Sequence, residues 1–403
     1  MNFLPLPWIR RLTNRPTPQW LLRLPGSLWS LWGRLAVGTL CWLSGGFASW
    51  GAESGLDNSP YPPSSLIEGL SWHWDTYRTA APGSDLWPVT WAADGNLYTA
   101  WGDGGGFGGS DSDGRVAMGF GRLEGSPETF IGINVNGGKK AEHPASFPLS
   151  GKTGALLSLH GTLWTSINLQ DGVWPNVHHV LAWSTNYGVS WTKADWMFSD
   201  RPGEFQPAKF LQFGKDYAGV PRRFAGYAYL YGPKQDSRRG SGDELFLARV
   251  PITKLRQRAS YQFFAGRGSF GQSKWASTFS DAKPVFVDHN GVAPAGAVYL
   301  PALKRFLLTS FHCGPGQLGV FDGPTPWGPW TQVAYYEDWG RMGSDGEGLI
   351  CGFPTKWISQ DGRILWCVFS AYGEGAKQGI HAHDRFNLVK VTLNMRDHPS
   401  AGH

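Results

Sequence analysis

Two aspartates flank a short predicted hairpin and are the residues best placed for catalysis. Asp85 begins the stretch DLWPVTW, and Asp103 follows LYTAWG after a tight turn. If that turn pairs residue 93 with residue 96, Asp85 lies opposite Gly104 and Asp103 opposite Leu86. Two carboxylates at one end of a hairpin can divide the roles of proton donor and of base or nucleophile, as glycoside hydrolysis requires. The alternative is that both aspartates only cap turns.

A glycine-rich segment, 104–115, follows Asp103. Its first part, GGGFGG, contains the pattern G-x-G-x-x-G, which binds a dinucleotide only between a strand and a helix. The following SDSDGRVAMGF has no helical periodicity, so we expect no nucleotide site. Asp111 and Asp113 resemble the start of a calcium loop, but Arg122 stands where a closing glutamate belongs. A structural calcium therefore remains open beside a plain turn, and no other metal or cofactor is predicted.

The positive charge of the chain is confined to its first residues. The formal net charge is +5, and residues 1–48 contain five arginines and no acid. The remaining chain has 31 basic and 31 acidic residues, so its body has no overall attraction for a phosphate backbone. We therefore expect no nucleic-acid partner.

Residues 1–48 are typical of an export signal. Their arginines precede an apolar run at 35–48, which ends in Gly46-Phe47-Ala48 with small residues at both cleavage positions. An uncleaved amphipathic anchor is the alternative. We expect an exported protein, periplasmic or extracellular, whose contact with a membrane is limited to this signal. The Ser-, Pro- and Gly-rich residues 49–66 are predicted to be a linker.

From residue 67 to residue 395 a two-strand unit recurs. Apolar or aromatic stretches flank turns near residues 94, 160, 217, 303 and 361, which are about 57 to 86 residues apart. Further apolar stretches lie between these hairpins, and SWHWDTYR precedes the first of them. Such a period predicts an all-β, five-bladed β-propeller, in which SWHWDTYR completes the last blade, followed by a tail at 396–403. A two-sheet sandwich is the alternative.

The segment STNYGVSW, residues 184–191, fits the Asp-box S-x-[D/N]-x-G-x-x-W of sialidase-like propellers. Its polar residue is expected to cap a turn and its tryptophan to pack into the blade. This motif indicates a fold and no substrate.

Propeller geometry brings the strand ends of every blade to the mouth of the central channel. We therefore expect Glu204 as a third carboxylate beside Asp85 and Asp103. Lys356 should face these acids, because a lysine in an aromatic-rich inner strand needs an anionic partner or ligand; a solvated lysine is the alternative. The other predicted substrate-binding residues are Trp87, Phe107, Lys152, Gln206 and His312.

Three cysteines follow the export segment, and export permits disulfides. Cys313 and Cys351 should lie on the same face of neighbouring blades, so we expect a disulfide between them. Cys367 lies mid-strand and should be a free, buried thiol.

Several motifs in order resemble a bacterial family, domain-of-unknown-function family 4185. They are GSDLWPVTWAADGNLYTAWGDGGGF, ARV, YQFFAG, FDGPTPWGPW and FPTKWISQDG, and the resemblance extends from about Gly69 to Leu393. The family is similar in fold to five-bladed sugar-acting propellers, and some distant members are endo-D-arabinanases. The resemblance implies a carbohydrate-active role without identifying the sugar.

Two functions of different classes are consistent with these observations. The first is a secreted glycoside hydrolase that acts on a polysaccharide or oligosaccharide through the carboxylate pair. The second is a non-catalytic glycan-binding propeller.

Overall fold

The computed structural model describes residues 59–145, 151–169, 178–199, 203–234, 242–312, 317–341, 347–372 and 382–397. The chain divides into two units, Met1–Trp50 and Gly51–His403, and every described residue belongs to the second. The predicted export segment, most of the predicted linker and Cys313 lie outside the described residues. In the described part, no helix is long and apolar enough to cross a membrane.

The described residues form antiparallel strands arranged in four sheets. The first sheet contains β2 (Asp85–Trp91), β3 (Leu97–Gly102), β4 (Met118–Glu124) and β5 (Ile131–Asn136). The second contains β6 (Gly151–Leu159), β7 (Thr162–Leu169), β8 (His178–Ser184) and β9 (Thr192–Ser199).

A nine-stranded sheet follows. It joins β10 (Lys209–Phe210), β11 (Tyr227–Gly232), β12 (Gly242–Pro251), β13 (Gln262–Arg267) and β14 (Ser273–Ala276) to β15 (Phe286–Leu300), β16 (Arg305–Phe311), β17 (Leu318–Gly323) and β18 (Thr331–Tyr336). The fourth sheet contains β1 (Ile67–Ala80), β19 (Glu347–Gly352), β20 (Ile364–Tyr372) and β21 (Phe386–Met395). Short 3₁₀ helices punctuate the loops: η1 (Lys215–Tyr217), η2 (Arg222–Phe224), η3 (Arg258–Ser260), η4 (Phe279–Asp281), η5 (Trp339–Arg341) and η6 (Thr355–Trp357). The all-β class predicted from the sequence is confirmed, and the two-sheet alternative is wrong.

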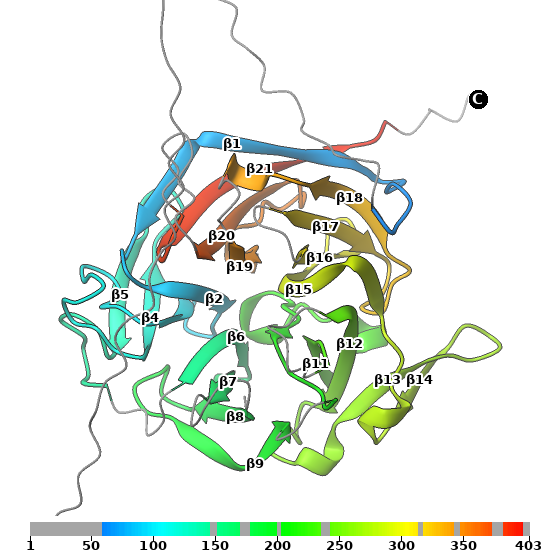
Figure 1. Cartoon of the computed structure of the whole chain (residues 1–403), viewed down its shortest axis with the longest axis horizontal. Helices are drawn as coiled ribbons and strands as arrows, with labels where there is room; N and C mark the ends of the chain where they lie inside the picture. Colours follow the sequence, from blue (N-terminus) through cyan, green and yellow to red (C-terminus); the bar gives the residue numbers. More distant parts are fainter. Residues whose placement is uncertain are drawn as a thin grey trace, which may run out of the picture. The chain divides into compact units, whose positions relative to one another are not determined.

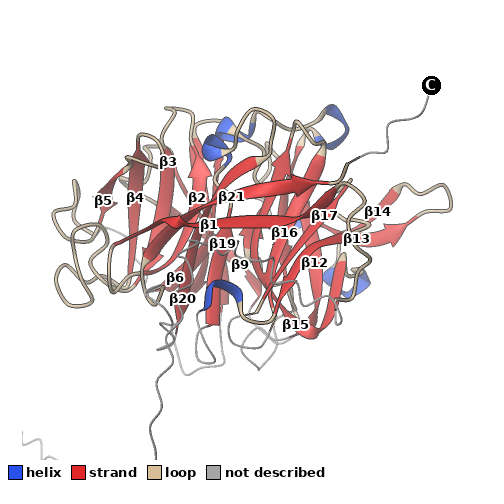
Figure 2. Ribbon diagram, turned by 90° about the horizontal axis from the view of Figure 1, so that it is seen from above, coloured by secondary structure: helices blue, strands red, loops and turns tan. Residues whose placement is uncertain are grey.

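The innermost strands of these sheets surround a common centre (Figure 1). They line a small central cavity of about 50 Å³ with residues 87–89 of β2, 154–156 of β6, 209–212 beginning in β10, 295–297 of β15 and 350–354 beginning in β19. Seen from the side, most strands run between the two faces, while β1 and β21 cross in front of them (Figure 2). Strands far apart in sequence are therefore brought together at the two ends of this cavity.

Apolar side chains fill the space between neighbouring sheets. One cluster joins the second sheet to the nine-stranded sheet through residues such as Leu181 and Phe205. Another joins the nine-stranded sheet to the fourth, and a third places Trp87 and Trp101 of the first sheet against Phe386 of the fourth. The sheets are therefore held together mainly by face-to-face burial of apolar surface.

The strand β1 joins the two ends of the described chain. It pairs antiparallel with β21 from Ile67 opposite Met395 to Ala80 opposite Phe386, with a shift in register between His73 and Arg78. SWHWDTYR was expected to complete the last sheet, and this prediction is confirmed.

Four of the five expected hairpins are present, but two details were predicted wrongly. Asp85 pairs with Gly102 rather than with Gly104, because the turn is one residue longer than expected, with Trp91 opposite Leu97, and a bulge follows Leu86. In the fifth hairpin, residues 355–357 form η6 instead of a strand, because Trp357 N–H donates to the carbonyl of Pro354 and closes a helical turn. The strand that pairs with β20 is β19, which precedes this turn.

The Asp-box forms the turn between β8 and β9. Ser184 Oγ accepts a hydrogen bond from Gly188 N–H at 2.8 Å, and Asn186 Oδ1 accepts one from Ser190 N–H at 3.0 Å. The ring of Trp191 stacks on Phe120 of β4 with centroids 4.2 Å apart. The tryptophan therefore packs against the neighbouring sheet as well as its own turn.

Candidate active site

An acidic cluster lies where β2 begins and β3 ends. Asp103 pairs through one carboxylate oxygen with Arg115, at 3.1 Å, and through the other with Lys152 of β6, at 2.5 Å. Asp85 lies beside them, because a Cβ atom on Gly102 would come 2.4 Å from Asp85 Oδ1 and 2.7 Å from Lys152 Cδ. Only glycine at position 102 allows these two side chains to approach each other.

The two aspartates have different environments. Burial raises the pKa of Asp85 to about 7, with Lys152 opposing the rise and the charges of Asp384 and Asp103 adding to it. Asp85 Oδ1 is buried and has no hydrogen-bond partner among the described residues, whereas the side chain of Asp103 is 40% exposed and bound by two cations. Near neutral pH Asp85 can therefore carry a proton beside a carboxyl group that is paired with two cations.

A third acid of the cluster comes from the distant end of the chain. Asp384 precedes β21 and pairs with His383 at 3.2 Å, and its backbone carbonyl accepts a hydrogen bond from Ser84 N–H at 3.0 Å. Burial raises the pKa of Asp384, and the charges of Asp103 and Asp111 contribute to the rise.

The glycine-rich segment is a structural loop that positions Asp103 and Arg115. The Asn134 side chain clamps it, donating to the carbonyls of Gly105, Phe107 and Lys139 and accepting from Phe107 N–H at 2.9 Å. The loop leads directly into β4, so the helix that a dinucleotide site needs is absent from this described segment. The possible calcium ligands Asp111 and Asp113 form ion pairs with Arg115 and Lys139.

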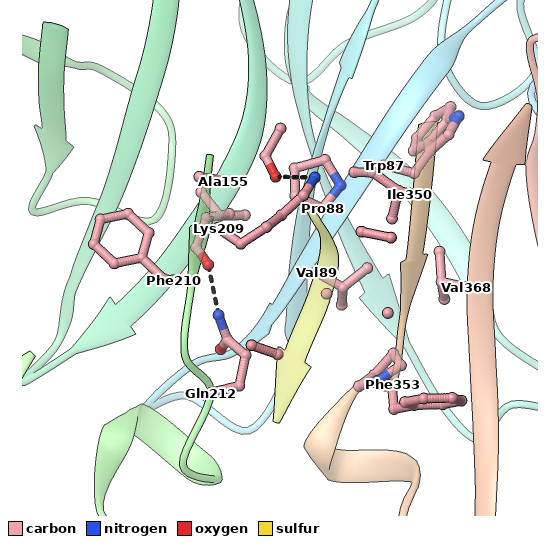
Figure 3. A pocket seen from close by; sticks show the side chains of 17 residues that line it. Trp87, Pro88, Val89, Ala155, Lys209, Phe210, Gln212, Ile350, Phe353 and Val368 are labelled. Carbon is pink, nitrogen blue, oxygen red and sulfur yellow. Dashed lines mark hydrogen bonds between the residues drawn. The ribbon is translucent and has the colours of Figure 1, made fainter. Parts of the chain in front are cut away.

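A cavity of about 230 Å³, lined by both polar and apolar residues, adjoins the acidic cluster. Lys152 and Gln206, both predicted to bind substrate, line it together with Leu86, Ser166, Asn168, His179 and Lys209. Lys209 also lines the central cavity, where its Nζ donates to the carbonyl of Gly154 at 2.9 Å (Figure 3). Burial lowers the pKa of Lys209 to about 7.

Lys209 was not among the predicted site residues, although the sequence contains a signal for it. It lies in AKFLQF, an apolar inner strand, and the argument applied to Lys356 holds equally for it. His179 and Asn168 carried no such signal, because their convergence on one cavity depends on the pairing of β7 with β8.

Trp87 and Phe107 were predicted to bind substrate, but both pack against other aromatic side chains. Trp87 is 0% exposed and packs against Trp101, Phe107 and Phe386, with centroids 5.0 to 5.4 Å apart. Phe107 lies over Gly132, where a Cβ would come 2.3 Å from its ring. Both aromatic rings thus belong to the core between the first and fourth sheets.

Three other predicted residues lie away from Asp85 and Asp103. Glu204 acts electrostatically on Arg258, whose guanidinium lies over Phe198 and Phe263. His312 is buried, with its ring stacked on Tyr335 at 3.8 Å and Nδ1 3.2 Å from a carboxylate oxygen of Asp288.

The third of these residues is Lys356, which belongs to η6 after β19. It lines a separate cavity with Glu128, Trp357 and Trp366. Since the innermost strands begin at the acidic cluster, the turn that η6 makes beyond β19 carries Lys356 away from it.

The cysteine predictions have opposite outcomes. Cys351 is a free, buried thiol, so the predicted Cys313–Cys351 disulfide is wrong. Its Sγ lies 3.2 Å from Sγ of Cys367, between β19 and β20, and therefore points into the fourth sheet. Cys367 is free and buried, as predicted.

Comparison with known sequences identifies the family. The model of the family Domain of unknown function (DUF4185) matches residues 159–362, slightly more than half of the chain. The chain belongs to this family. The resemblance inferred from the sequence motifs is thereby confirmed. Curated proteins give no match to the DUF4185 chain.

Solved structures similar to this DUF4185 protein share little sequence with it. The GH43_1 enzyme from Xanthomonas citri has 11% identity and a TM-score of 0.42, covering 81% of this chain and 89% of that one. A putative exo-beta-1,3-galactanase from Bifidobacterium bifidum has 10% identity and a TM-score of 0.43, covering 80% and 93%. A protein of unknown function from Dyadobacter fermentans has 10% identity and a TM-score of 0.41, covering 81% and 100%.

Proposed function

We propose that this DUF4185 chain is an exported glycoside hydrolase, built as a five-bladed β-propeller, that cleaves a polysaccharide at its acidic cluster. The nine-stranded sheet supplies two of the five blades, one built on β10 and one on β15, since each contributes an innermost strand to the central cavity. Export is supported by the basic and apolar composition of residues 1–48.

The observation that carries the catalytic proposal is the contrast between Asp85 and Asp103. Asp85, with a pKa raised to about 7 by burial, is the general acid that protonates the glycosidic oxygen. Asp103, exposed and ion-paired, is the carboxylate that activates water or attacks the sugar. Lys152 and Arg115 hold Asp103 in place, and Lys152 lies close to both acids.

Release of reducing sugar from a panel of plant, algal and bacterial polysaccharides tests this proposal. On a cleaved substrate, Asp85→Asn and Asp103→Asn should each lower kcat by at least about 10²-fold, the lower range of what a positioned acid or base contributes. Asp113→Asn is the matched control, because Asp113 lies on the same loop and pairs with Lys139 instead. It should keep wild-type activity.

Full activity in both variants would contradict the assignment. Retained binding of a glycan that the wild type does not cleave would instead indicate the alternative, a glycan-binding propeller.

A further inference from the structure

The cavity beside the acidic cluster contains polar groups that the proposed catalytic step does not use. Lys209 is 8% exposed, and within the described ranges its Nζ has one hydrogen-bond acceptor, the carbonyl of Gly154. Among the residues that the structure describes, no carboxylate lies within 4.0 Å of this ammonium group. Two of its N–H donors are therefore left for a ligand.

Further unpaired groups line the same cavity. His179 is 5% exposed, and neither of its ring nitrogens has a hydrogen-bond partner in the described part of the chain. Asn168 Oδ1 is also buried without a partner there. Buried polar atoms without partners are rare in folded proteins, because each loses its hydrogen bonds to water without replacement. Their convergence on one cavity indicates a site for a polar ligand.

The charge of this cavity is positive. Its two lysines are Lys152 and Lys209, and its lining contains no acidic residue. Asp103 compensates the charge of Lys152, whereas no carboxylate among the described residues pairs with Lys209. Burial lowers the pKa of His179 to about 3, with His178 adding to the effect, so its imidazole is neutral and offers one donor and one acceptor.

We propose that this cavity binds an acidic sugar residue, whose carboxylate or sulfate oxygens contact Lys209 while its hydroxyl groups contact His179 and Asn168. The inference rests on the proposed function and adds to it the substrate class, an anionic polysaccharide. An anion at Lys209 compensates the buried ammonium and restores the charged form that burial disfavours. The contact is a charge-assisted hydrogen bond, the strong kind that discriminates a charged sugar from its neutral counterpart.

Isothermal titration of the full chain tests the inference directly. The protein carries Asp85→Asn so that no probe is cleaved. The acidic probes are an oligogalacturonate, a hyaluronan oligosaccharide and a sulfated galactan oligosaccharide. Each is titrated beside its neutral counterpart, the methyl ester or the desulfated sugar. At least one acidic probe should bind about tenfold or more tightly than its counterpart, and the probe that does so distinguishes carboxylate from sulfate.

A second variant ties the effect to Lys209. Adding Lys209→Met should weaken binding of the acidic probe about tenfold to a hundredfold and leave binding of the neutral counterpart unchanged. Removing an uncompensated buried charge should not impair folding, which circular dichroism checks. Lys254→Met is the control, because Lys254 is exposed and lies outside the cavity.

The inference is overturned if no acidic probe binds better than its neutral counterpart, or if Lys209→Met leaves acidic binding unchanged. Cleavage of a neutral polysaccharide that depends on Asp85 would uphold the proposed hydrolase while contradicting the acidic substrate. Charge-selective binding without cleavage by the wild type would uphold the acidic ligand and contradict the proposed hydrolase.

Discussion

At the scale of single residues, the raised pKa of Asp85 suits it to donate a proton but lowers the stability of the folded chain when Asp85 is ionised. Burial is the largest cause of its raised pKa, and Asp384 and Asp103 add repulsion that Lys152 only partly offsets. The ionised form of Asp85 is thus disfavoured in the folded chain relative to the unfolded one, where water solvates it freely. Such a group holds a proton near neutral pH and can donate it to a leaving group.

The raised pKa of Asp85 predicts how the free energy of unfolding depends on pH. The folded-state pKa of Asp85 is about 7 and its ordinary value is 3.8, so the folded protein binds the extra proton between these values. Folding stability should therefore fall as the pH rises from about 4 to 7, and stay lower above that. Asp85→Asn removes this loss. Relative to wild type, the variant should gain about 2–4 kcal/mol in the free energy of unfolding between pH 4 and pH 8.

Urea unfolding of both proteins at the two pH values measures this difference. Since all other titrating groups are common to both chains, their contributions largely cancel. An equal pH dependence in wild type and variant would show that Asp85 is not buried as an acid.

The sequence was sufficient to nominate Asp85, Asp103 and Lys152, because strand ends with charged residues can be read from hairpin patterns. The pairing register of β2 with β3 was harder to predict. The bulge after Leu86 places Leu86 and Trp87 at positive φ of 76° and 70°. Neither residue type favours that backbone region, so nothing in the local sequence predicts it. Lys356 was misplaced because one helical turn after Pro354 replaced the expected strand.

At the scale of elements, the glycine-rich loop holds the charged side chains of Asp103 and Arg115 in position. Its glycines permit close packing, since a Cβ on Gly106 would come 2.5 Å from Trp101, and one on Gly104 would come 2.1 Å from the carbonyl oxygen of Gly83. Asn134, 4% exposed, supplies hydrogen bonds that fix the loop to β5. The composition that suggested a phosphate or calcium loop thus serves the positioning of Asp103 and Arg115.

This arrangement predicts the effect of removing the clamp. Asn134→Ala removes the hydrogen bonds to the N–H of Phe107 and to the carbonyls of Gly105, Phe107 and Lys139, and should lower the free energy of unfolding by about 2–4 kcal/mol. It should also lower kcat on a true substrate, because Asp103 loses its fixed position. Asn96→Ala, in the exposed turn before β3, is the control and should change both quantities little. Denaturant unfolding and steady-state kinetics check the two effects, and wild-type kcat in a destabilised Asn134→Ala would contradict the positioning role.

At the scale of the whole described unit, the fold brings four distant segments to one site. These segments are the first hairpin with the loop after β3, the second sheet through β6, β7 and β8, the segment that leads into β10, and the segment that leads into β21. The pairing of β1 with β21 joins the ends of the sheet arrangement and thereby fixes Asp384 beside Ser84. The hairpins that build this arrangement were predictable from alternating apolar residues and turns. The convergence of Lys209, His179 and Asn168 was not, because it depends on contacts between strands that are far apart in sequence.

The central claim is that Asp85 acts as the general acid of a glycoside hydrolase, and the pH dependence of kcat/KM on a cleaved polysaccharide tests it most directly. Because Asp85 must be protonated and has a pKa of about 7, kcat/KM should fall tenfold per pH unit above about pH 7. Asp85→Asn should lower kcat by at least about 10²-fold and lose this fall in kcat/KM above pH 7. A profile that stays flat from pH 5 to pH 9, or an Asp85→Asn variant with wild-type kcat/KM, would contradict the assignment.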